Sequence, residues 1–80
     1  MNLFLGIDTS CYTTSLCLVD SSYHVVADER LILSVKQGGR GLSQSNMVYQ
    51  HMRNLPVLFE RLVPYLAHAR ICAIGVTNKP

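Results

Sequence analysis

The chain has 80 residues, of which 49% are hydrophobic, and a formal net charge of +2. A chain of this size can form at most one small domain and buries only about 60% of its unfolded surface. The charge permits a tRNA partner but is too small to indicate a nucleic-acid surface by itself. Three cysteines without a C-x-x-C pair indicate neither a disulfide framework nor a zinc site. The apolar start lacks the basic leader of a signal peptide, so we expect a cytoplasmic protein that does not enter a membrane.

The first part of the chain predicts three antiparallel strands. Residues 3–8 and 14–20 carry apolar strand patterns, and a turn at residues 20–22 leads into a third strand over 23–30. Residues 31–35 can extend this third strand. The glycine-rich composition of residues 36–41 then predicts a loop.

From residue 45 the apolar spacing becomes helical. The spacing of 4, 3, 4, 3 and 4 predicts one buried stripe formed by Val48, Met52, Leu55, Phe59, Leu62 and Leu66. Two prolines lie in this segment, and each removes a backbone donor, so we expect a helix that is kinked or split near Asn54. Residues 71–77 then predict a strand parallel to the first, because a helical crossover separates the two.

The strand patterns predict an α/β sheet that the chain does not cover by itself. In residues 3–8 and 71–77 both alternating faces are apolar, which is typical of sheets covered on two sides. The chain supplies helical material for only one side. We therefore expect residues 1–80 to be a single incomplete amino-terminal lobe, with a protein partner or a second copy on the uncovered sheet face.

A polar turn between the first two strands is the candidate binding site. The carboxylate of Asp8 ends the first strand, and hydroxyl groups follow it at Thr9, Ser10, Thr13 and Thr14. Hydroxyls and turn amides can donate to phosphate oxygens, whereas Asp8 would hold Mg²⁺ through water. This pattern predicts a nucleotide, ATP or an adenylate, with Mg²⁺ at the turn. An ordinary hairpin turn is the alternative, since Ser and Thr favour turns.

Three segments resemble the TsaD family, also called Gcp or glycoprotease-like. Residues 5–11, Leu-Gly-Ile-Asp-Thr-Ser-Cys, resemble its opening, and residues 50–56, Gln-His-Met-Arg-Asn-Leu-Pro, resemble its first-helix signature. Residues 73–77, Ala-Ile-Gly-Val-Thr, resemble the strand that follows. The similarity covers essentially this whole chain but only about the first quarter of a family member.

The resemblance implies a ribonuclease-H-like, actin-like ATPase lobe. Family members transfer a threonylcarbamoyl group from its adenylate to the N6 amine of adenosine 37 in tRNA, together with partner proteins and a bound metal. Their metal-binding histidine pair matches no part of this chain, so the resemblance assigns it no catalytic residue. His51 has no second histidine at ligand spacing in the helix, and a helix histidine bonded to a neighbour is its expected role.

The turn departs from the transferase pattern. The transferases usually carry Asp, Glu and Thr where Tyr12, Thr13 and Thr14 stand here, so two acidic groups are absent. Their absence weakens cation binding. Two hypotheses follow: a nucleotide-binding part of a TsaD-like transferase that is inactive alone, or a divergent paralogue that acts as a partner-binding module.

Overall fold

The computed structural model describes residues 1–10, 12–35 and 43–77. Four strands, β1 (Asn2–Asp8), β2 (Thr13–Asp20), β3 (Val25–Ile32) and β4 (Arg70–Thr77), and one helix, α1 (Gln44–Leu66), make up a small α/β domain. The predicted loop at residues 36–41 lies outside the described residues. Among the described residues, no helix combines the length and the apolar character needed to cross a membrane.

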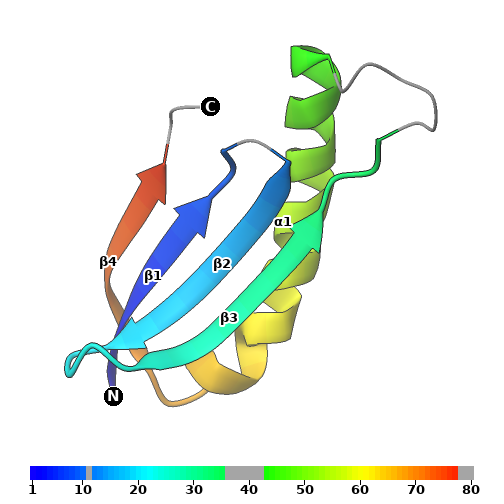
Figure 1. Ribbon diagram of the computed structural model, residues 1–80. Helices are drawn as coiled ribbons and strands as arrows, with labels where there is room; N and C mark the ends of the chain where they lie inside the picture. Colours follow the sequence, from blue (N-terminus) through cyan, green and yellow to red (C-terminus); the bar gives the residue numbers. More distant parts are fainter. Residues whose placement is uncertain (11, 36–42, 78–80) are drawn as a thin grey trace.

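The sheet has the strand order β3-β2-β1-β4, and α1 lies across one of its faces (Figure 1). β1, β2 and β3 form the predicted antiparallel meander, and β4 pairs with β1 in parallel, as predicted. The carboxyl ends of β1 and β4 therefore lie at the same edge of the sheet, with the start of β2 beside them. This edge places Asp8 next to Thr77.

The core lies between α1 and the sheet. Alternate residues of β1 and β2 face the helix, and they pack against one helical stripe. The fully buried leucines are Leu3, Leu16, Leu18, Leu58 and Leu62.

The helix is a single element, so the predicted split near Asn54 is wrong. It runs as one element over Gln44–Leu66, with Pro56 and Pro64 inside it. Each proline removes the bond to the carbonyl four residues earlier, at Met52 and at Glu60. All four of these residues are exposed, so water can bond those carbonyls while the opposite side of the helix packs on the sheet.

The predicted buried stripe is correct at only half of its positions. Leu62 is buried, and Leu55 and Leu66 pack against the core, but Val48, Met52 and Phe59 are exposed. The residues buried from α1 are His51, Leu58 and Leu62. The helix thus carries two apolar stripes, and the stripe centred on Leu58 packs against the sheet.

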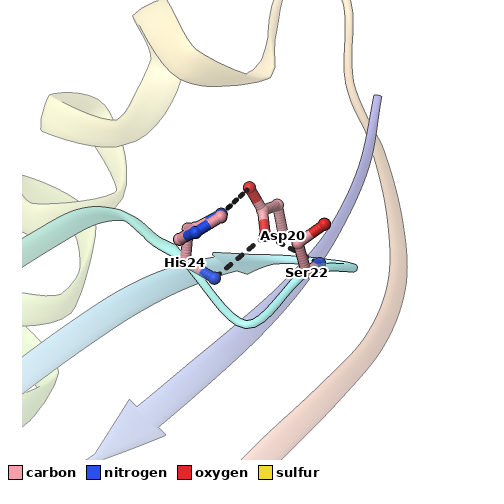
Figure 2. Close-up of polar contacts among 3 residues, drawn as sticks. All are labelled: Asp20, Ser22 and His24. Atoms are coloured by element: carbon pink, nitrogen blue, oxygen red, sulfur yellow. Dashed lines mark hydrogen bonds and ion pairs between the residues drawn. The ribbon is translucent and has the colours of Figure 1, made fainter.

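The β2–β3 turn is closed by one carboxylate. Asp20 Oδ1 accepts bonds from the backbone N–H groups of Ser22 at 2.8 Å and His24 at 3.0 Å, and its Oδ2 lies 3.5 Å from His24 Nδ1 (Figure 2). Tyr23 adopts φ of 67°, a left-handed conformation that bulky residues rarely adopt. The bonds to Asp20 hold the chain in this conformation.

Candidate functional site

Asp8 occupies the carboxyl end of β1, where its carboxylate joins the turn to β4. Asp8 Oδ1 accepts hydrogen bonds from the Ser10 backbone N–H at 2.8 Å and from the Ser10 hydroxyl at 2.6 Å. The Thr77 hydroxyl of β4 donates a third bond at 2.8 Å. Because all three contacts use Oδ1, the second carboxylate oxygen is the one placed to bind a hydrated cation.

The hydrogen bonds keep Asp8 ionised. The Ser10 hydroxyl, then the Ser10 backbone N–H and then Thr77, hold the pKa of Asp8 below its usual range. Each donor stabilises the charged form. The carboxylate therefore carries its negative charge throughout the neutral pH range.

Asp20 has the same local geometry without the long-range contact. Both aspartates end a strand and accept a bond from the backbone N–H two residues later. The donors to Asp20 all come from its own turn (Figure 2). Asp8 also accepts a bond from Thr77, which is 69 residues away. An ordinary turn explains Asp20 fully, but it does not explain the bond from β4 to Asp8.

The predicted hydroxyl residues separate into two groups. Thr9, Ser10 and Thr13 are partly exposed around the turn. Thr14 is fully buried, and its Oγ1 lies 2.6 Å from His51 Nδ1 and accepts a 3.2 Å bond from Asn54 Nδ2. A hydroxyl without exposed surface is not placed to bind a phosphate, so Thr14 stabilises the contact between β2 and α1 instead. His51 is bonded to a neighbour, as its sequence position predicted.

A pocket of about 540 Å³ opens beside Asp8 on the sheet face opposite to α1. This volume lies within the range of small-molecule sites, about 300–1,000 Å³. Gly6 of β1 is in register with Gly75 of β4, so no side chain fills the floor there. The polar groups around the floor belong to Asp8, Ser15, Asp28, Arg30 and Thr77.

Asp28, Arg30 and Thr77 are polar pocket residues that the sequence did not predict. Arg30 Nη2 and Nε donate to the two oxygens of Asp28 at 2.9 and 3.2 Å. These bonds from Arg30 hold the pKa of Asp28 below its usual range and raise that of Arg30. The strand register could have placed the Arg30 guanidinium near Asp8. Ser15 pairs with both Asp8 and Arg30, so the three residues lie in one row across the sheet.

Among the described residues, one thiol lines the pocket, that of Cys17. Burial, followed by the charge of Asp28, raises the pKa of this thiol. It therefore stays protonated at neutral pH and is a poor nucleophile.

Among the described residues, no three carboxylate, imidazole or thiol groups converge to hold a metal ion. Mg²⁺ therefore fits here only with ligands from water and a bound phosphate.

Replacing Ser10 with Ala is expected to raise the pKa of Asp8 toward its ordinary value, because the Ser10 hydroxyl is the largest cause of the shift. Thr77→Val should raise it less. The carboxyl carbon signal of Asp8, followed by NMR through an acid titration, measures this pKa.

The lowered pKa of Asp8 also makes the stability of the fold depend on pH. The folded pKa of Asp8 lies below the unfolded value, so its stabilisation is present above about pH 4 and is lost as the pH falls through the folded pKa. Ser10→Ala should reduce this loss. Ser22→Ala is the matched control. It should leave the pKa of Asp20 unchanged, because only the backbone of Ser22 bonds Asp20. An unchanged Asp8 pKa in Ser10→Ala would contradict the assigned contacts.

No protein-family model matches the chain, and no match was found among curated proteins.

Proposed function

We propose that the chain binds a nucleotide, ATP or an adenylate, with Mg²⁺ at the β1–β2 turn, as the amino-terminal part of a TsaD-like transferase. The observation that carries the proposal is the ionised Asp8 carboxylate, held on one oxygen by Ser10 and Thr77 at the shared carboxyl ends of β1 and β4. Ligands commonly bind at such strand ends in α/β sheets.

The chemistry of the turn supports binding of a phosphate with its cation. Asp8 would hold Mg²⁺ through water, since like charges keep its carboxylate away from the phosphate oxygens. Thr9, Ser10 and Thr13 are exposed enough to donate hydroxyl bonds. A single carboxylate leaves most of the Mg²⁺ coordination to water and phosphate, which is the usual arrangement for this ion.

The strand order supports a partial ribonuclease-H-like lobe within this proposal. The TsaD resemblance implies the following arrangement for the start of such a lobe: an antiparallel meander, a helix, and a strand parallel to the first strand. In the proposed transferase this chain binds and orients the nucleotide.

A partner-binding module of the same lineage is the second candidate. It is favoured by the absence of the two acidic residues at positions 12 and 13 and by the buried, fully engaged hydroxyl of Thr14. Such a module would retain the sheet and lose the affinity for Mg²⁺ and nucleotide.

Calorimetric titration of MgATP into the 80-residue protein tests the two candidates. We expect Asp8→Asn to weaken binding by about tenfold or more, because it removes the charge that holds the cation and keeps an oxygen for Ser10 and Thr77. Without Mg²⁺ the difference between variant and wild type should disappear.

Asp20→Asn is the matched control, since Asp20 likewise accepts a bond from the backbone N–H two residues later, at the opposite end of β2. It should bind MgATP like the wild type. Equal affinity in Asp8→Asn and wild type with Mg²⁺ present would remove Asp8 from the site. No binding by the wild type, combined with an intact fold by circular dichroism, would favour the module.

A further inference from the structure

A row of polar residues crosses the sheet face opposite to α1 and ends at Arg30. Asp8 of β1 is in register with Thr77 of β4 and with Ser15 of β2. Ser15 is in turn in register with Arg30 of β3. Residues opposite each other on paired strands point to the same face, and in Figure 1 this face is turned toward the reader, with α1 behind it. We name these residues the polar row, and all of them line the pocket beside Asp8.

The Arg30 guanidinium is open to this pocket. Its Nε and Nη2 each donate one bond to Asp28, its ion-pair partner among the described residues. The remaining N–H groups can donate to another acceptor, and the side chain is 66% exposed. The pair lies within one strand and joins no two elements of the fold, and an ion pair this exposed contributes little to stability. A role in binding accounts better than stability for a guanidinium at this place.

The charges of the pocket determine which ligand Arg30 can bind. Among the described residues that line it, the charged groups are the carboxylates of Asp8 and Asp28 and the guanidinium of Arg30, so their net charge is −1. A free anion is therefore repelled. Mg²⁺ at Asp8 reverses the sign of this sum and makes the pocket attract phosphate, which a guanidinium binds through paired N–H donors.

The width of the polar row suits one hydrated Mg²⁺ and one phosphate group. Asp8 and Arg30 are two strands apart, which is about 10 Å at a strand spacing of about 4.8 Å. Mg²⁺ held through a water molecule lies about 4–5 Å from the carboxylate oxygen, because its coordination bonds are about 2.1 Å long. A phosphate group on this Mg²⁺ then lies over Ser15, within reach of Arg30. Gly6 and Gly75 leave the neighbouring floor free of side chains for the rest of the ligand.

We propose that Arg30 is a phosphate-binding residue, which donates to the phosphate group whose Mg²⁺ is held by Asp8. This inference rests on the proposed function and extends it from the β1–β2 turn across the sheet face to β3. Asp28 has two opposing effects. It orients the guanidinium over the pocket, and its negative charge competes with the phosphate for the same donors.

Calorimetric titration of MgATP into variants of the 80-residue protein tests the assignment. Arg30→Gln should weaken binding by about tenfold, because it removes a charge-assisted hydrogen bond to phosphate. Asp28→Asn should strengthen binding, because it removes a negative charge beside the phosphate and releases donors of Arg30. In the double variant Asp28→Asn with Arg30→Gln, this gain should be smaller. A residue that only supported the strand would weaken binding in each variant.

Arg61→Gln is the matched control for Arg30→Gln. It removes the same charge from a residue of α1 that lies 3.5 Å from Glu29 of β3, outside the residues that line the pocket. It should bind MgATP like the wild type. Circular dichroism checks the fold of each variant.

The dependence on Mg²⁺ separates Arg30 from Asp8. Asp8→Asn should raise the Mg²⁺ concentration needed for half-maximal binding of ATP, because it removes a group that holds the cation. Arg30→Gln should weaken binding at saturating Mg²⁺ and leave that concentration unchanged.

The outcomes distinguish this inference from the proposed function. Wild-type affinity in Arg30→Gln, combined with weaker binding in Asp8→Asn, would overturn the inference and leave the proposed function standing. Weaker binding in Arg30→Gln with wild-type affinity in Asp8→Asn would keep Arg30 and remove Asp8 from the site. Equal losses in Arg30→Gln and Arg61→Gln, or weaker binding in Asp28→Asn, would overturn the phosphate contact. No binding by the folded wild type would overturn both.

Discussion

Leu58→Ala is expected to lower the free energy of unfolding by about 2–5 kcal/mol, the usual cost of truncating a fully buried leucine. Leu58 has no exposed surface and belongs to the core cluster with Leu16 and Leu18 of the sheet. Domains of this size have little stability in reserve, roughly 0.05–0.15 kcal/mol per residue. Urea denaturation followed by circular dichroism measures the loss.

The neighbouring Phe59→Ala is the control for this prediction. Phe59 has 37% of its surface exposed and lies on the other stripe of the helix, so its truncation should cost less than half as much. If both variants lost the same stability, or Phe59→Ala lost more, the assignment of the buried face of α1 would be wrong.

The strands could be predicted because their chemistry is local. Runs of apolar residues bounded by turn residues located all four to within about two residues, and the crossover length predicted that β4 lies parallel to β1. The turn after Asp20 was predicted by residue type, and the structure shows its carboxylate closing that turn.

The orientation of the helix could not be predicted because α1 has two apolar stripes. Val48, Met52 and Phe59 continue the spacing of Leu55, Leu62 and Leu66, so periodicity does not distinguish the two faces. The sheet selects the face that contains Leu58 and also accepts His51, because Thr14 satisfies its ring nitrogen. This selection depends on a contact between residues 37 positions apart, which no local pattern reports.

The candidate site was predicted in composition and only partly in geometry. Asp8 and Ser10 are in contact within the turn that the sequence marked as polar, but the bond between them was not predicted. Thr77 and Arg30 reach the site through strand pairing, and Thr14 leaves it because alternation along β2 points its side chain toward α1. A turn rich in hydroxyls therefore provides fewer exposed donors than its sequence contains.

Thr14→Val is expected to lower the free energy of unfolding by about 1–3 kcal/mol, although it keeps the volume of the side chain. The Thr14 hydroxyl accepts a bond from Asn54 and lies 2.6 Å from His51 Nδ1, and both Thr14 and His51 are buried. A valine offers neither contact, so the ring nitrogen loses this partner where water has little access.

Three comparisons separate the hydrogen bonds at Thr14 from its packing. Thr14→Ser keeps the hydroxyl and loses one methyl group, so it should cost about 1 kcal/mol. Thr13→Val, on the neighbouring and partly exposed position, should cost less than Thr14→Val. A double-mutant cycle with His51→Leu should give a coupling energy of about 0.5–3 kcal/mol, because the two residues are in contact. A Thr14→Val variant as stable as the wild type, with no coupling to His51, would show that apolar packing alone holds α1 against β2.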